Sequence, residues 1–300
     1  MRIIKVTNVE QFAAKILPKQ PQNNKTIVES ILKDVKKNGD VAIRKYEKKF
    51  SKANISSLRL TQSEIKNAYS KISKSELDAL RLAKARLEKT ESAIKSLFKN
   101  KTINQDGIKI SKKFIPIQSV GCYIPGGLAR YPSSAIMSVV PAKIAGVKRI
   151  AVVSPPNSDG KIDPLTIVSA DICGANEIYK TGGVQSIAAL SFGTKSIPKV
   201  DKIVGPGGAF VTTAKSMISD QTGIDMLAGP TELGIIADNS ANPKFVALDL
   251  ISQSEHSNDT FCYLITTSEK LAKSVNKTVS ELIPTIQRGK KLSSIGHYWF

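Results

Sequence analysis

Two kinds of hydrophobic pattern divide the chain near position 119. Residues 1 to about 100 place apolar side chains at helical spacing, as in Thr26–Lys37, where isoleucine and valine recur every four residues. An Asn-Gly pair directly after this segment predicts a helix stop. The short apolar stretch Ile108–Ile117 contains a proline and predicts an exposed strand and a linker.

From Ser119 onward, short apolar strands alternate with segments of helical pattern. The predicted strands lie in SVGCYIP, RIAVVSPP, EIYKTGG, KVDKIVGPGG, GIDMLAGP, ELGIIAD and TFCYLITTS. Strands of this length that alternate with longer helices indicate βα units and a parallel sheet. The crossover rule makes their connections right-handed. The predicted fold class is therefore α/β.

Five of these strands end in turns rich in proline and glycine. In parallel sheets, ligands bind at the carboxyl ends of strands, and helix amino termini there favour anions. Such turns can cradle a pyrophosphate, but tight turns favour glycine in any case, and no GxGxxG motif follows the first strand. From spacing alone, nucleotide binding and simple turn geometry both stay open. The turns are Pro125-Gly126-Gly127, Pro155-Pro156, Gly182-Gly183, Gly205-Pro206-Gly207-Gly208 and Gly229-Pro230.

A helix is predicted over Pro243–His256, with Asn242 as its N-cap. Gln253 and His256 are three residues apart and therefore share a face near the helix carboxyl end. Imidazole is a common zinc ligand, whereas an amide oxygen is an unusual one. The pattern alone is explained as well by a histidine that interacts with the helix dipole.

Composition places the chain among ordinary globular proteins of more than one domain. Its 300 residues are 41% hydrophobic and 23% charged, and no apolar run is long enough for a membrane span. The amino terminus lacks the unbroken apolar region of a signal peptide. Cys122, Cys173 and Cys262 lie far apart in apolar segments, which favours buried free thiols in a reducing compartment. We expect a cytoplasmic protein.

The net charge of +19 does not by itself indicate nucleic-acid binding. Residues 1–120 hold 27 basic and 11 acidic residues, and residues 121–300 hold 17 and 14. The excess is thus spread over the polar faces of the amino-terminal helices, opposite an apolar face predicted at Leu80, Leu82, Leu87, Ile94 and Leu97. No aromatic residues interleave with these lysines, as stacking on a single strand would require. We expect solvated basic faces and no specific nucleic-acid partner.

Motifs in a fixed order resemble the histidinol dehydrogenase family. The first is VKKNGDVAIRKYEKKF at Val35–Phe50, and the others are GCYIPGG, YPSS, PAK, EIYKTGGVQ, VGPGG, AGPTE and SQSEH. Together they cover roughly residues 25–283. The resemblance implies an enzyme that uses NAD and zinc to oxidise L-histidinol to L-histidine through the aldehyde, the last step of histidine biosynthesis.

The resemblance also implies roles for individual residues. Tyr123 and Gln185 match positions that line the NAD site of the family. Gln253 and His256 match two of its zinc ligands, which also contact the substrate. Thr231 stands where the family usually has a substrate-contacting serine, and it keeps the hydroxyl.

Other family features have no match in this sequence. Gly208 replaces the usual asparagine of a GPGN motif, which removes an amide that would contact the nucleotide. The family's catalytic Glu-His pair, an aspartate ligand and a late histidine ligand are unmatched, because the similarity ends near Pro284. We therefore assign no catalytic residue and expect a truncated chain that is inactive as written. The alternative is a non-catalytic nucleotide-binding paralogue or fragment.

The family's architecture predicts two Rossmann-like parallel-sheet units with an amino-terminal helical region. The first domain would be discontinuous, with residues 1–118 plus 231–300, and would carry the zinc-ligand helix. The inserted nucleotide-binding domain would span residues 119–230. The resemblance further implies a homodimer, and the absence of a long apolar run predicts no membrane partner.

Overall fold

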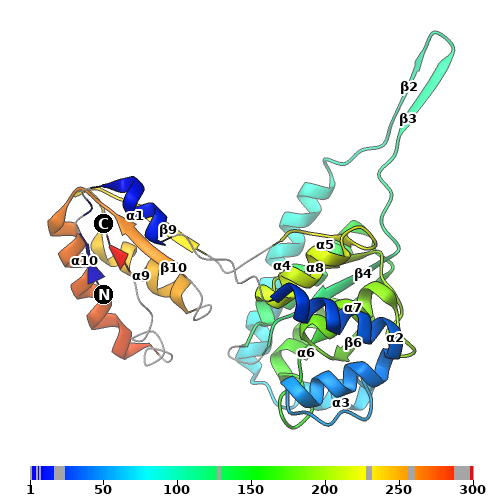
Figure 1. The fold of residues 1–300 in the computed structure, drawn as a ribbon. Helices are drawn as coiled ribbons and strands as arrows, with labels where there is room; N and C mark the ends of the chain where they lie inside the picture. Colours follow the sequence, from blue (N-terminus) through cyan, green and yellow to red (C-terminus); the bar gives the residue numbers. More distant parts are fainter. Residues whose placement is uncertain are drawn as a thin grey trace. The chain divides into compact units, whose positions relative to one another are not determined.

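The chain folds into two compact units, which we describe separately. The structure is a computed structural model and describes residues 2–4, 6, 8–16, 24–126, 130–227, 232–255, 261–286 and 298–299. The larger unit is Gln22–Gly229, and the smaller unit combines Met1–Pro21 with Pro230–Phe300 (Figure 1).

The larger unit is built on a five-stranded parallel sheet in the order β6-β5-β4-β7-β8. Its strands are β4 (Ser119–Tyr123), β5 (Arg149–Ser154), β6 (Glu177–Lys180), β7 (Lys202–Val204) and β8 (Gly223–Ile224). All five lie where the sequence predicts strands. The α/β class and the parallel sheet are therefore confirmed.

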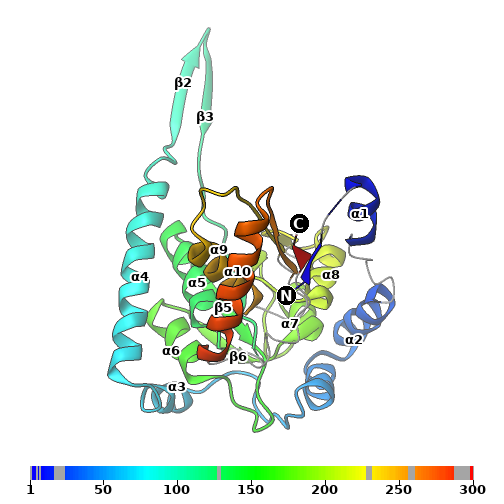
Figure 2. The ribbon, with the colours of Figure 1, turned by 90° about the vertical axis from the view of Figure 1, so that its left-hand side faces the viewer.

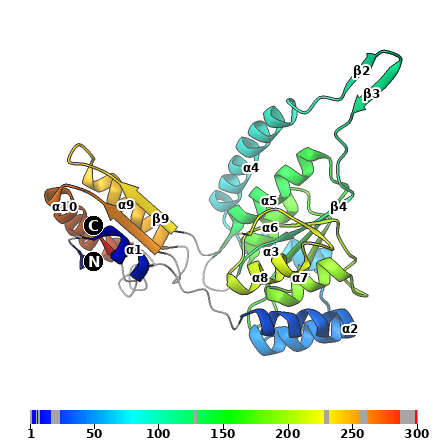
Figure 3. The same ribbon diagram turned by 45° about the horizontal axis from the view of Figure 1, so that its top comes forward.

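Helices cover both faces of this sheet, because successive strand residues point to opposite sides. One core joins Tyr123, Val153 and Ile203 to the helices α2, α7 and α8, and the other joins Cys122 and Val152 to α3–α6. Figure 3 shows α2 beside α7 and α8, and α4 beside α5. The helices are α2 (Asn24–Phe50), α3 (Gln62–Tyr69), α4 (Lys74–Lys95), α5 (Pro132–Ala145), α6 (Pro164–Ile172), α7 (Gly183–Phe192) and α8 (Ala209–Ile218).

Helix α2 does not stop where the sequence predicts. Gly39 has non-helical angles (φ 52°, ψ −129°), but the chain resumes helical geometry immediately and continues to Phe50. The Ser196 hydroxyl and backbone N–H donate to the carboxylate of Asp40, just past the kink. The Asn-Gly pair therefore marks a kink rather than a helix end, and tertiary packing stabilises the second half of the helix.

A hairpin extends from the larger unit between α4 and β4. Strands β2 (Lys101–Gln105) and β3 (Ile108–Lys112) pair antiparallel, and every one of their residues is exposed. Figures 1 and 2 show the hairpin reaching away from the sheet and its helices. The expected exposed strand at Ile108–Ile117 is thus β3 plus an irregular segment.

The predicted apolar face of α4 is only partly buried. Leu80 is buried and Leu87 packs against the core, whereas Leu82, Ile94 and Leu97 are exposed. Leu82 lies two residues from Leu80 and so points to another side of the helix. The other two lie at the hairpin end, beyond the last core contacts.

The smaller unit holds a four-stranded parallel sheet in the order β1-β11-β10-β9. The buried side chains of α9, α10, Cys262 and Leu264 form one core. Asn242 caps α9 through Lys244 N–H, as predicted. The elements are β1 (Arg2–Ile3), α1 (Val9–Ile16), β9 (Glu232–Ile236), α9 (Pro243–Ser254), β10 (Phe261–Ile265), α10 (Glu269–Leu282), a 3₁₀ turn (Ile283–Thr285) and β11 (Tyr298–Trp299).

The division of the chain differs from the expected domains in one respect. Residues 22–118 belong to the larger unit, and not with residues 231–300. The reason is packing: α2 lies against α7 and α8, α3 against α6, and α4 against α5. The amino-terminal helices therefore complete the core of the inserted sheet.

Two further expectations concern the environment of the chain. Cys122, Cys173 and Cys262 are all free and buried. Burial raises the pKa of the Cys122 thiol to about 12, which keeps it protonated and unreactive. Among the described helices, none combines the length and the apolar character needed to cross a membrane.

Candidate functional site

The strand order of the larger unit creates a switch point between β4 and β7. The chain passes from β4 to β5 and β6 on one side and then returns to place β7 and β8 on the other. Ligands of open parallel sheets bind at the carboxyl ends of the strands at such a point. The turns after Tyr123 and Val204 lie there.

These two turns are in close contact, and glycine makes the contact possible. A Cβ on Gly205 would lie 2.1 Å from the carbonyl oxygen of Tyr123. Gly205 also has a φ of +113°, which other residues rarely adopt. The glycine therefore lets the two strand ends meet.

A partly buried ion pair holds the Gly205 backbone through both its N–H and its carbonyl. Lys215 is 2% exposed, and its Nζ donates to the Gly205 carbonyl at 3.0 Å and to the Asp225 carboxylate. The Gly205 N–H donates to the other Asp225 oxygen at 2.8 Å. Burial raises the pKa of Asp225, but hydrogen bonds from Lys215 and from backbone N–H groups outweigh it and lower the pKa overall.

The predicted cofactor residues lie together beside this turn. The Tyr123 hydroxyl accepts the N–H of Gly183 at 3.4 Å, at the first residue of α7. Burial raises the pKa of Tyr123 to about 12, so the phenol keeps its proton at neutral pH. Gln185, on the same turn of α7, is buried, and its Oε1 has no hydrogen-bond partner. An orphaned buried oxygen of this kind points to a missing polar partner.

A carboxylate that the sequence analysis did not single out lies under Gln185. Glu47, on the last turns of α2, is fully buried and accepts the Gln185 Nε2–H at 2.8 Å. It lies inside the Val35–Phe50 motif, and that motif was the available signal. Lys215 and Asp225 were also missed as a pair, because helical periodicity does not show that a lysine is buried.

Gly208 occupies the N-cap of α8 in an extended conformation, with φ −67° and ψ 177°. No side chain caps the helix there, and a Cβ at this position would meet no atom within 4 Å. An asparagine would fit without strain, so the departure from the family motif removes a polar group without any packing reason.

The predicted metal and substrate residues belong to the smaller unit. Thr231 and His256 lie outside the described residues. Gln253 lies on the last turn of α9, and its Nε2 is buried without a partner. Within the described part of the chain, no three His, Cys, Asp or Glu side chains gather in a way that could hold a metal ion.

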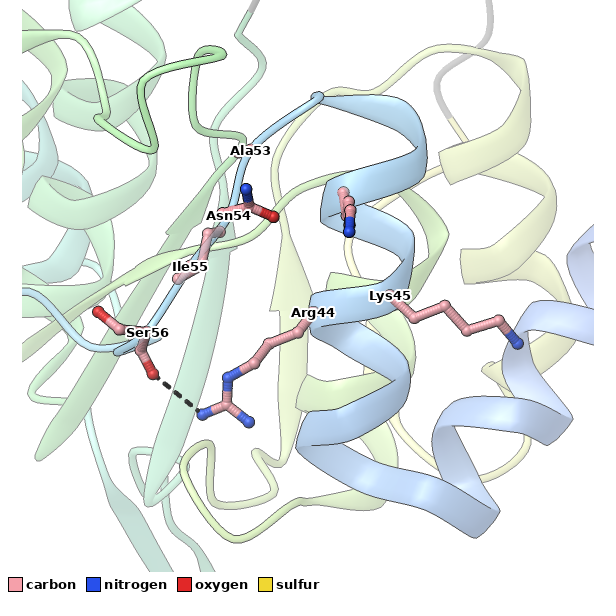
Figure 4. A pocket seen from close by; sticks show the side chains of 7 residues that line it. Arg44, Lys45, Ala53, Asn54, Ile55 and Ser56 are labelled. Carbon is pink, nitrogen blue, oxygen red and sulfur yellow. Dashed lines mark hydrogen bonds between the residues drawn. The ribbon is translucent and has the colours of Figure 1, made fainter.

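A separate open pocket lies between α2 and the segment that follows it (Figure 4). Arg44, Lys45 and Lys48 line one side, and residues 53–56 line the other. Arg44 donates to the Ser56 carbonyl at 3.3 Å. None of the residues predicted to bind a cofactor contributes to its lining, so it is distinct from the switch-point site.

Comparison with known proteins identifies relatives in the histidinol dehydrogenase family. A model of the histidinol dehydrogenase family matches residues 17–296, a longer stretch than the sequence motifs mark. Histidinol dehydrogenase from Methanocaldococcus jannaschii is 43% identical over 263 residues, which are 88% of this chain and 61% of the relative. That from Lactococcus lactis subsp. lactis is 40% identical over 298 residues, 96% of this chain and 67% of the relative.

A solved structure agrees with these relatives. The crystal structure of histidinol dehydrogenase from Elizabethkingia anophelis superposes with a TM-score of 0.89 at 34% identity, covering 100% of this chain and 70% of that one. The chain thus spans between 61% and 67% of the length of the two curated relatives.

Proposed function

The chain belongs to the histidinol dehydrogenase family, and on that premise we propose that it supplies the dinucleotide site of an enzyme that oxidises L-histidinol to L-histidine with NAD. The observation that carries the proposal is the buried, unpartnered Oε1 of Gln185 beside Tyr123, at the carboxyl edge of the sheet. Two residues expected to bind NAD thus lie together where ligands of this fold bind.

Several features of the described residues support a dinucleotide ligand. Gln185 offers an acceptor, and Tyr123 offers a phenol that keeps its proton. The Gly205 turn lies in contact with Tyr123, and Lys215 fixes the Gly205 carbonyl. When bound, NAD supplies a hydride acceptor, and the chain's residues orient it and exclude water.

Zinc is the second proposed cofactor, with Gln253 and His256 as its ligands. The unpartnered Gln253 Nε2 is a hydrogen-bond donor at the end of α9, whereas a zinc ion would bind the amide oxygen. The described residues do not by themselves form a metal site, since they hold one of these two ligands. Gln253, His256 and Thr231 are proposed to contact L-histidinol as well.

NADH formation from L-histidinol tests the activity. The purified chain should be compared with the same chain extended by the carboxyl-terminal third of the Methanocaldococcus jannaschii relative, each with zinc and NAD. The proposal expects turnover from the extended chain and little from the chain alone, because the Glu-His pair has no match here. No turnover from the extended chain, together with NAD binding, would favour a non-catalytic nucleotide-binding paralogue.

We also propose that the chain forms a homodimer and works in the cytoplasm. A lone two-stranded hairpin is only marginally stable in water, yet β2 and β3 expose Ile103, Ile108 and Ile110. Burial of these side chains against a second copy would stabilise the hairpin. The three buried free cysteines are consistent with a reducing compartment.

A further inference from the structure

The buried carboxylate of Glu47 is the most unusual polar group near the proposed NAD site. It is fully buried, and no cation is paired with it within the described residues. A buried charge is costly unless hydrogen bonds satisfy it. Four donors do so: Oε1 accepts from the Thr181 hydroxyl at 2.8 Å, the Gly182 N–H at 2.9 Å and the Gln185 amide at 2.8 Å, and Oε2 accepts from the Ser51 hydroxyl at 2.7 Å.

This arrangement fixes which end of the Gln185 amide points to the ligand. Reversing the amide would place its oxygen against a Glu47 oxygen, and two acceptors would face each other without a proton. Nε2 therefore faces Glu47, and Oε1 is left unpartnered. A ligand that meets Oε1 must bring a donor.

The Glu47 carboxylate also occupies the position at the start of α7 where a ligand phosphate would otherwise bind. Helix amino termini bind phosphate through their first N–H groups. Here the Gly182 N–H already donates to Glu47, and the Gly183 N–H donates to the Tyr123 hydroxyl. A phosphate at this turn would find those donors satisfied and a negative charge beneath them.

We propose that Glu47 is a positioning residue for the dinucleotide site. Glu47 holds the Gln185 amide so that its oxygen accepts a hydroxyl or amide of the ligand, and it keeps phosphate away from α7. The inference rests on the proposed function and deepens it. The subsite at Tyr123 and Gln185 then takes a ribose, carboxamide or exocyclic-amine donor, and the phosphates lie elsewhere.

NAD titration calorimetry on the full chain tests this role through a double-mutant cycle. Glu47→Gln should weaken NAD binding by about tenfold, because the charge-assisted hydrogen bond that holds the Gln185 amide is lost. Gln185→Glu should weaken binding further, since two carboxylates then face each other. The double variant should bind NAD more tightly than Gln185→Glu alone but not as tightly as the wild type, because the amide at position 47 can donate to the carboxylate at position 185 while the Gly182 N–H loses its acceptor.

Ser51→Ala is the matched control, since it removes a donor from the same carboxylate without touching Gln185. It should change NAD affinity by less than about twofold. Equal effects of Ser51→Ala and Glu47→Gln, or a double variant no better than Gln185→Glu alone, would overturn the proposal.

An NMR readout separates this inference from the proposed function. The Gln185 side-chain amide, identified by its loss in Gln185→Leu, should exchange slowly in the wild type and in Ser51→Ala but faster in Glu47→Gln. If the wild type binds no NAD and this pattern holds, the proposed function fails and the orientation of Gln185 by Glu47 stands. Exchange that does not depend on Glu47 would refute the orientation itself.

Discussion

Replacing Gly208 by asparagine should tighten NAD binding and slightly stabilise the fold. Gly208 has extended angles that any residue adopts, and an added Cβ meets no atom within 4 Å. At the N-cap, the asparagine Oδ1 can accept an N–H of the first turn of α8 and leave Nδ2 for the nucleotide. The substitution therefore adds two interactions without strain.

The magnitudes follow from these two interactions. Asparagine stabilises an N-cap over glycine by only a few tenths of a kcal/mol, roughly 0.3. One new hydrogen bond to the ligand contributes about 0.5–1.5 kcal/mol, which corresponds to roughly two- to tenfold tighter binding. Titration calorimetry with NAD and thermal unfolding measure the two effects separately.

Gly208→Asp is the control for capping. Aspartate caps as well as asparagine but has no donor, and its charge opposes a pyrophosphate, so stability should rise while NAD affinity does not. If Gly208→Asn binds NAD no tighter than the wild type, or if Gly208→Asp tightens it equally, the placement of the dinucleotide at the start of α8 is wrong.

Three other predictions address the ion pair, the hairpin and the basic surface. Lys215→Met should lower the free energy of unfolding by about 2 kcal/mol in urea titrations, less than for a fully buried pair because Asp225 keeps some exposure. The fold lowers the pKa of Asp225, so the ion pair stabilises the folded chain at pH values above the usual carboxyl pKa of about 3.9. This stabilisation is lost as the pH falls through the folded pKa of Asp225. If Lys215→Met lost stability in acid as strongly as the wild type, this prediction would be contradicted. Ile103 lies opposite Ile110 on the hairpin, and Ile103→Lys should shift the proposed dimer toward monomer in sedimentation velocity. Ile94→Lys, at another exposed isoleucine, is the control. An unchanged mass in Ile103→Lys would contradict the prediction. Binding to random DNA should fall steeply with salt in fluorescence anisotropy, and sequence-selective binding at physiological salt would show that the basic helices are a specific surface.

The strands of the larger sheet, and β9 and β10 of the smaller one, could be predicted from sequence because each is a short apolar run between turn residues, whereas β1 and β11 were not predicted. β4 and β5 are examples in which nearly every side chain is buried, and that burial leaves a continuous apolar pattern. The extent of the amino-terminal helices was harder to predict. Gly39 looks like a stop, but packing of the second half of α2 against α7 outweighs the local signal.

The candidate site, like the fold, has parts that could be predicted from the sequence and parts that could not. Family motifs pointed to Tyr123 and Gln185 as candidates for the NAD site, and the strand pattern predicted that they lie at the carboxyl edge of the sheet. Neither source could show that Glu47 orients Gln185, because the contact joins residues 138 positions apart. The buried state of Lys215 was hidden as well, since lysine in a helical pattern usually indicates a solvated face.

A crystal structure of the chain with NAD tests the central claim most directly. The account predicts dinucleotide density at the carboxyl ends of β4 and β7, with a hydroxyl or amide group of the ligand within hydrogen-bond distance of Gln185 Oε1. The phosphates should lie away from the first turn of α7. Density in the pocket between Arg44 and Ser56 instead, or a phosphate against Gly182, would contradict the account.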